Sequence, residues 1–419
     1  MSPDPSPKTS QPARRDGFEH ELRDAMRLVR AALTELLDSI GADSARPQEM
    51  ARRFGINRNM SWKLCRIVHS KDPVAVVGHL PGPSGLKILL EICGRHHAPQ
   101  ALSEQVVEAM AAFDQMVQRH AGDRARLEVL INAMASGASA ADLQEPSRRQ
   151  AFLGNAAIWG VQARLQFAIH IHVPSQDAPG RVDATAISGL LGFQRLRSTA
   201  NWPLVRLQGM NKDRGAISTI STAALDPLAQ DGGPPLVPAF SSIAAERLHP
   251  VPIPSGQIWE LTEGPVGLTG TIDCAFARRA RVFSGQWAQG DLLTSTCMLP
   301  LYTPVETAQL DLLVHRELSY ADVAPTVSLF SRMEGGPDVT AENAVRYQLP
   351  VSGQLEDLGS GLPALTSPFA PRHAALTSWA MGRIGAETQE FRAWRLVLTY
   401  PPLPSSLSLS VDLPRRDGA

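Results

Sequence analysis

The hydrophobic pattern of this chain changes near residue 150, and this change constrains the fold more than any other feature. Before it, apolar residues recur at three- and four-residue steps, and the longest such stripe, over 18–40, ends at Gly41. After it, short β-like runs such as QIWELTE (257–263) and FRAWRLVLTY (391–400) alternate with Pro- and Gly-rich sequence. The 419 residues are too many for one ordinary core. The sequence therefore predicts an α+β multidomain protein, with an N-terminal all-α module followed by a larger β-rich domain.

These patterns divide the chain into five segments. Residues 1–17 contain four prolines and little apolar material, so we expect a disordered tail. Residues 18–72 form a small helical domain, and 73–135 extend it with further helices. Residues 136–150 are small and polar and predict a linker. Residues 151–419 form the β-rich domain, whose role no motif reveals.

The composition excludes several classes of protein. Hydrophobic residues make up 43% of the chain, which excludes wholesale disorder. The four cysteines include no CxxC pair, which argues against a disulfide scaffold and fits a reducing cytosol. The N-terminus lacks the apolar region of a secretory signal, and no apolar run reaches the roughly 20 residues that span a bilayer. We therefore expect a cytoplasmic protein without membrane contact.

Positive charge is concentrated in one short segment. Residues 46–71 contain seven lysines and arginines against Glu49 alone, a local net charge of +6 in a chain whose total is -1. Such clustering favours a polyanion as partner.

The same segment contains the sequence MARRFGINRNMSWKL (50–64), which has the elements of two helices joined by a tight turn. Ala51 is small where a second helix would cross the first. Gly55 tolerates the positive φ that a tight turn needs. Asn57 is a typical N-cap for a helix over 58–69, and Leu64 would pack on its inner face.

This pattern resembles helix-turn-helix transcriptional regulators over about residues 46–68. The resemblance implies that the second helix enters the major groove of double-stranded DNA, with arginine and asparagine side chains on base edges and the other cations on phosphates. The predicted DNA-binding residues are Arg52, Arg53, Asn57, Arg58, Asn59, Trp62, Lys63 and Arg66. Ser61 departs from the family, which usually has a β-branched apolar residue there. If Met60 packed inward instead, a different face of the helix would point outward.

The predicted function is therefore a DNA-binding transcriptional regulator. Its C-terminal domain would bind a small-molecule effector or form a homodimer or higher oligomer, and the 18–40 stripe could provide a dimer seam. The alternative is a structural, self-assembling protein whose β-rich domain oligomerises and whose N-terminal helices mediate protein contacts. We predict no catalytic residue, metal or cofactor, and an enzymatic role stays open only for residues 151–419.

Two histidine-containing segments are candidate metal sites. His170 and His172 in IHIHVP would lie on one face of a strand, as two ligands do in some metal sites. The sequence shows no third ligand, so ordinary strand residues are favoured. Cys93, His96 and His97 in CGRHH are explained by a helix terminus with histidine at its negative end.

Other functional motifs are weak or absent. The sequence contains no GxSxG nucleophile motif and no phosphate-binding P-loop. The basic run ARRARVF (277–283) is interpreted either as an exposed, charged edge strand or as a second contact for a polyanion, and the first is favoured.

Overall fold

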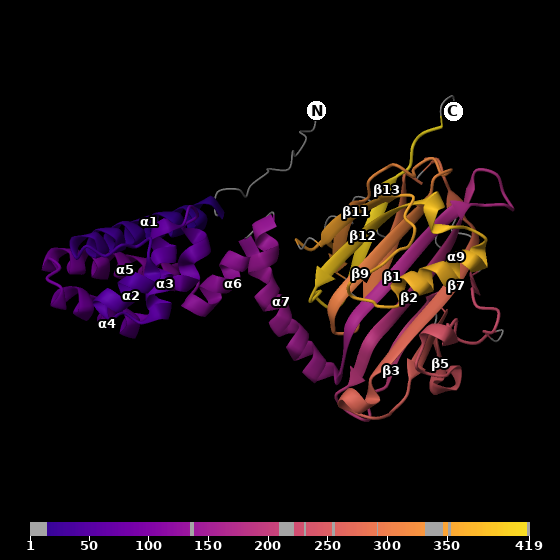
Figure 1. Ribbon diagram of the computed structural model, residues 1–419, viewed down its shortest axis with the longest axis horizontal. Coiled ribbons are helices and arrows are strands. Elements are labelled where there is room, and N and C mark those ends of the chain that lie inside the picture. Colours follow the sequence, from indigo (N-terminus) through magenta and orange to yellow (C-terminus); the bar gives the residue numbers. More distant parts are fainter. Residues whose placement is uncertain are drawn as a thin grey trace, which may run out of the picture. The chain divides into compact units, whose positions relative to one another are not determined.

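The computed structural model describes residues 15–134, 138–208, 222–229, 232–253, 256–290, 292–331, 347–350 and 353–416. The chain divides into two compact units, Met1–Ala135 and Ser136–Ala419. Helices make up the first unit and a large mixed sheet dominates the second (Figure 1), which confirms the α+β class and the order of the two parts. Residues 1–14 of the expected tail lie outside the described residues, and 15–17 begin the first helix.

The first unit is a bundle of helices around one core. Its elements are α1 (Arg15–Ser39), α2 (Pro47–Phe54), α3 (Arg58–His69), the 3₁₀ helix η1 (Val74–His79), α4 (Pro83–Arg95), α5 (Gln100–His120) and α6 (Arg124–Met134). The apolar stripe of α1 is buried inside this unit and packs with α5. Glu21 of α1 also accepts hydrogen bonds from Arg119 (2.9 Å) and His120 (3.0 Å) of α5. The stripe that could have formed a dimer seam is therefore used within the unit.

Over residues 138–150 the structure has a helix where the sequence predicted a linker, and residues 136 and 137 of that predicted linker lie outside the described residues. This helix, α7 (Ala138–Trp159), belongs to the second unit. Arg148 is buried, and its Nε donates a hydrogen bond to the carbonyl oxygen of Thr399 (3.2 Å), while the Phe152 ring packs against that of Tyr400. The alanine content that suggested flexibility also favours helix, and these contacts attach the helix to the sheet.

A seven-stranded sheet forms the centre of the second unit, in the order β11-β12-β9-β1-β2-β7-β4. Only the β1–β9 pair is parallel; the other pairs are antiparallel. The strands are β1 (Val161–Pro174), β2 (Arg181–Arg195), β4 (Thr222–Ala224), β7 (Ile272–Gly285), β9 (Val305–His315), β11 (Gln354–Ser360) and β12 (Phe391–Thr399).

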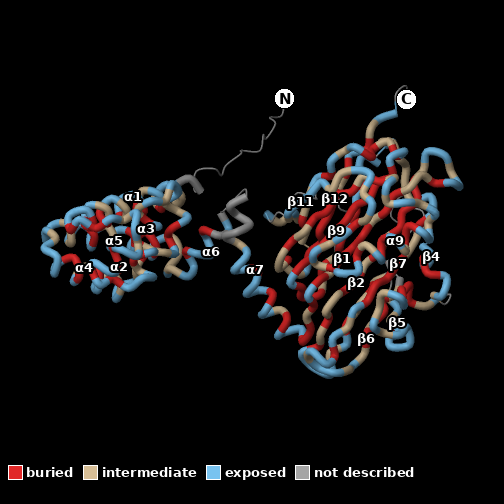
Figure 2. The backbone as a smooth tube through the Cα atoms, in the orientation of Figure 1, coloured by how far each residue is buried: buried red, intermediate tan, exposed pale blue. Residues whose placement is uncertain are grey.

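Other elements cover both faces of this sheet. A three-stranded sheet of β10 (Thr326–Ser331), β13 (Ser405–Asp412) and β8 (Thr294–Leu301) packs on one face. Helix α9 (His373–Ile384) lies on the other face (Figure 1). A third sheet, β3 (Trp202–Gln208), β6 (Gly256–Leu261) and β5 (Leu248–Ile253), has its own apolar cluster with β1, β2 and β7. Buried residues consequently run along the central strands (Figure 2).

The alternation of side chains along β1 shows how this layering positions polar groups. Leu165, Phe167 and Ile169 point to the cluster that contains α9, while Ala168 points to the facing sheet. Because both faces of the central strands are covered over much of their length, a polar residue on these strands can be enclosed by protein, as His172 and Asp311 are. Two candidate sites in this unit arise in this way, one on each face.

Candidate functional site

Helices α2 and α3 are joined by a three-residue turn. α2 ends at Phe54, and Gly55 follows with φ of 69°, in the left-handed region. The side chain of Asn57 caps α3 by accepting a hydrogen bond from the backbone N–H of Asn59 at 2.9 Å. Ile56, between them, is buried in the core. The turn therefore has the local geometry that its glycine and asparagine predict.

Ser61 lies on the inner face of α3, together with Leu64, Cys65 and Ile67. Its hydroxyl donates a hydrogen bond to the carbonyl oxygen of Pro47 in α2, at 2.5 Å. Met60 is only half-buried. The alternative register, with Met60 packed inward in place of Ser61, is thus not adopted. The serine is tolerated because its polar group is satisfied by the neighbouring helix.

The predicted DNA-binding residues lie on the outside of this helix pair. Seven are exposed: Arg52, Arg53, Asn57, Arg58, Asn59, Trp62 and Arg66. Lys63 is half-buried. On α3 the exposed stripe runs from its first turn through Trp62 to Arg66, and the Arg66 guanidinium lies over the Trp62 ring, 5.2 Å from its centroid. The Trp62 ring also contacts His79 of η1.

The cations of this surface differ in how far other groups compensate them. Arg46 pairs with Asp43 and Glu49, so its charge is balanced locally. By contrast, Arg52, Arg58, Lys63 and Arg66 form no ion pair with any carboxylate in the described part of the chain.

A hollow of about 270 Å³ lies beside α3, between its first turns and the segment 79–85. Lys63, Asn59 and His79 line it. Partial burial, together with the charges of Arg66 and Lys63, lowers the pKa of His79 below its ordinary value. Arg66 and Lys63 therefore add to the effect of burial on this histidine.

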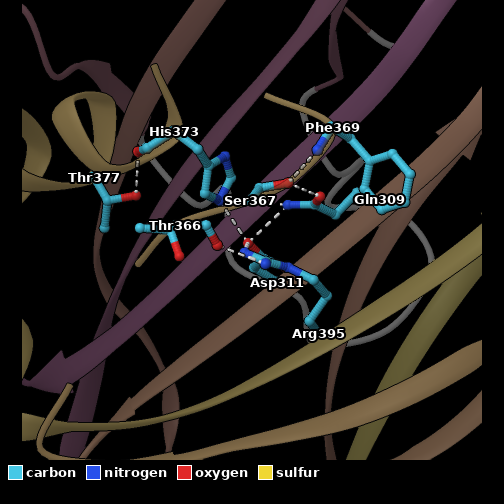
Figure 3. A network of polar contacts seen from close by, with 8 residues as sticks. All are labelled: Gln309, Asp311, Thr366, Ser367, Phe369, His373, Thr377 and Arg395. Atoms are coloured by element: carbon cyan, nitrogen blue, oxygen red, sulfur yellow. Dashed lines mark hydrogen bonds and ion pairs between the residues drawn. The ribbon is translucent and has the colours of Figure 1, made fainter. Parts of the chain in front are cut away.

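A second polar site lies under α9 in the other unit (Figure 3). Asp311 of β9 is fully buried and accepts two hydrogen bonds from Arg395 of β12, from Nε and Nη2, both at 2.8 Å. Its Oδ2 also lies 2.6 Å from Nε2 of His373, the first residue of α9. Gln309 donates to the same oxygen at 3.0 Å. One carboxylate therefore connects two strands and a helix.

The charge of Asp311 is retained despite its burial. Burial alone would raise the pKa of this carboxyl, but the hydrogen bonds from Arg395 and His373 and their charges outweigh it, and the pKa lies below its ordinary value. A carboxylate only accepts, so Nε2 of His373 carries a proton. The other ring nitrogen, Nδ1, is buried and has no hydrogen-bond partner among the described residues.

His373 lines a cavity of about 270 Å³ between α9 and the neighbouring loops. Phe167 and Phe240 contribute apolar walls, and Asp273 is the lining carboxylate. The guanidinium groups of Arg164 and Arg372 each donate one hydrogen bond to a backbone carbonyl, which leaves further donors free. The cavity is near the lower end of the size range of small-molecule sites, roughly 300 Å³.

The other segments weighed from the sequence are accounted for structurally. The run ARRARVF lies in β7, which pairs with β2 on one side and β4 on the other, so it is not an edge strand. Arg279 pairs with Asp183 and Arg281 with Asp177, at 2.9 and 2.7 Å. In CGRHH, Cys93 faces the core and the His96 ring contacts Phe54. These two residues therefore have separate structural roles.

No protein-family model, curated protein or solved structure matches this chain. None of the helices that the structure describes is both long and apolar enough to cross a membrane.

The Asp311 network is not evident from the sequence, because His373 and Arg395 are 62 and 84 residues from Asp311 in the chain. A weak signal was present. Asp311 and Arg395 each interrupt an apolar strand, in LDLLVH and AWRLVL. A single charged residue at a core-facing position of a strand has to be paired, so two such strands predict a buried ion pair.

Proposed function

We propose that this chain is a DNA-binding transcriptional regulator in which α3 enters the major groove. The observation that carries the proposal is the exposed stripe of Arg58, Asn59, Trp62 and Arg66, whose two guanidinium groups have no carboxylate partner among the described residues. A structural helix pair on a protein surface normally has interspersed charges of both signs.

The roles of the side chains follow from their positions on the helix pair. Arg58 and Asn59, in the first turn of α3, are suited to bidentate contacts with guanine and adenine. Arg52 and Arg53 at the end of α2 are suited to phosphates, as is the half-buried Lys63. Stacking on Trp62 limits the conformations of Arg66, which reduces the entropy lost when it binds.

Fluorescence anisotropy of the full chain on a labelled DNA duplex of mixed sequence tests this proposal. The variant Arg58→Ala/Arg66→Ala is expected to bind about 10-fold or more weakly, and its log–log salt slope should fall by about 1 for each phosphate that the variant no longer neutralises. The matched control is Arg23→Ala/Arg27→Ala, which removes the same charge from α1, where both arginines pair with acidic neighbours. Equal losses of affinity in the two variants, or binding without a salt slope, contradict the proposal.

A second candidate function, binding of a small molecule by the β-rich unit, is supported by the cavity beside His373. The lining of the cavity has an excess of positive charge, because it contains two arginines and one aspartate. Two phenylalanines form its apolar walls. A small aromatic hydroxy acid matches these features, since its ring can pack between the apolar walls and its carboxylate can pair with arginine.

Ligand-observed NMR with salicylate and 4-hydroxybenzoate as probes tests this candidate. Arg372→Ala should weaken binding because the arginine lines the cavity. Arg383→Ala, which removes an exposed arginine from the other end of the same helix, should not. Failure of both probes to bind the full chain rejects this ligand class and leaves the DNA proposal untouched.

A further inference from the structure

Three side chains with metal-binding chemistry meet on the face of the central sheet opposite α9. His170 and His172 alternate with Ile171 on β1 and both face the second sheet, where Cys297 of β8 points back at them. One ligand atom from each residue lies within 4.8 Å of the other two. Cys297 is the third donor that the sequence did not reveal, because 125 residues separate it from His172.

The separation of two of the donors matches that of ligands on one zinc ion. Nε2 of His172 lies 3.5 Å from Sγ of Cys297. Tetrahedral zinc, with Zn–N of about 2.0–2.1 Å and Zn–S of about 2.3 Å, holds a nitrogen and a sulfur roughly 3.5 Å apart. The half-buried His170 ring would have to approach by up to about 1.5 Å to complete the set.

The surroundings hold His172 in the orientation that a ligand needs. Its Nδ1 lies 3.1 Å from the hydroxyl of Tyr320, which is fully buried. If Nδ1 donates to that oxygen, the lone pair of Nε2 points at Cys297, as in metal sites whose histidines are oriented by an outer hydrogen bond. Burial also lowers the pKa of His172 to about 3 and that of His170 to about 4, so both rings are neutral at physiological pH.

We propose that His170, His172 and Cys297 bind a Zn²⁺ ion, with water at the fourth position. Two imidazoles and a thiolate are donors that zinc prefers, and His170, the most accessible of the three, gives the water a route. The same three donors bind blue copper when a long axial ligand, commonly a methionine, is present, and the side chain of Met298, a residue that is 40% exposed on the outer side of β8, does not supply that ligand. On binding, the Cys297 thiol loses its proton to solvent and a Zn–S bond forms.

Cobalt substitution tests this site in the full chain. The protein is stripped with a chelator, which is then removed, and titrated with Co²⁺, whose bond to a thiolate gives a near-ultraviolet charge-transfer absorption. We expect one equivalent of cobalt to produce this band and Zn²⁺ to abolish it by displacement. Cys297→Ser should lose the band. Cys274→Ser is the matched control, since Cys274 is equally buried but lies in β7, away from the cluster, and it should keep the band.

A second variant keeps the test decisive if Cys297→Ser does not fold. Tyr320→Phe retains the ring and removes only the hydroxyl that contacts His172. It should keep the cobalt band but bind about 10- to 100-fold more weakly, as expected when the outer partner of a ligating histidine is removed. The absence of a thiolate band in the folded wild-type protein, or a band that survives Cys297→Ser, overturns the proposal.

Discussion

Changing a single atom of a buried charged group should have a large effect on the free energy of unfolding, and Asp311 is the clearest case in this molecule. Asp311→Asn keeps the shape of the side chain but leaves the guanidinium of Arg395, which is 4% exposed, without its counter-charge. Removing one partner of a buried pair costs about 3–5 kcal/mol, so urea unfolding of the β-rich unit should show a loss of this size. Asp357→Asn breaks a 2.6 Å ion pair between the exposed Asp357 and the half-buried Arg392 at the protein surface, and should cost less than about 1 kcal/mol. Similar losses of stability in both variants would mean that the Asp311 network adds no more than a surface pair.

The pH dependence of stability should reflect His172. Its pKa is lowered from 6.5 to about 3 by burial, so the unfolded chain binds the proton more readily than the folded one. The stabilisation from the neutral ring is complete above pH 6.5 and is lost as the pH falls toward 3. At pH 5 the loss is about 2 kcal/mol. In chelator-treated protein, His172→Phe should remove about half of the loss of stability that the two buried histidines cause between pH 6.5 and 5, because His170, whose pKa is lowered to about 4, contributes a similar share. His249→Gln, at an exposed position in β5, should leave that part of the profile unchanged.

At the scale of elements, the α2–α3 turn depends on the backbone of Gly55. Its φ of 69° is unfavourable for a residue with a Cβ, although no atom lies within 4 Å of the place where a Cβ would be. Gly55→Ala should therefore cost about 1 kcal/mol through conformation alone, and Gly55→Asn less, because asparagine tolerates this region. Gly94→Ala, in the regular backbone of α4 and equally open, should stabilise by roughly 0.5 kcal/mol. Chemical denaturation of the three variants gives the sign of each change in the free energy of unfolding. A stabilising effect of Gly55→Ala would contradict the strained turn.

The helical elements were predictable because their signals are local. The stripe of α1, the proline in the first turn of α2 and the cap of α3 each lie within a few residues of the structure that they specify. α7 was missed because its alanine- and serine-rich start resembles a linker, and the contacts that hold it, from Arg148 and Phe152, are to residues about 250 positions later.

The sites of the β-rich unit could not be predicted because strand register creates them. β1 and β9 are parallel neighbours, and β9 and β12 are antiparallel neighbours that place Arg395 opposite Asp311. The sequence shows the residues His170, His172, Asp311 and Arg395, but it does not show which strands pair and therefore which residues meet. Whether a polar residue on a strand is a surface group or part of a buried site depends on which layer covers its face.

At the scale of the whole molecule, the two units have separate cores. Among the described residues, the buried members of the helical unit's apolar cluster lie between Leu22 and Ile131, and those of the three clusters of the β-rich unit lie between Val161 and Leu413. Each unit therefore buries its own hydrophobic surface, and the proposed DNA-binding surface and the proposed metal site lie in parts that can fold separately.

Separate cores predict two unfolding transitions in calorimetry. Leu33→Ala removes a fully buried side chain of α1 and should cost about 2–5 kcal/mol, which lowers the transition of the helical unit by on the order of 10 °C. Leu310→Ala, in β9, should lower only the other transition. Circular dichroism identifies the two transitions, because most of the helical signal is lost in the transition of the helical unit. When the Leu33→Ala variant is heated to a temperature at which its helical unit is unfolded, cobalt should still bind to the β-rich unit. A single transition that moves with either substitution would show that the two units unfold as one.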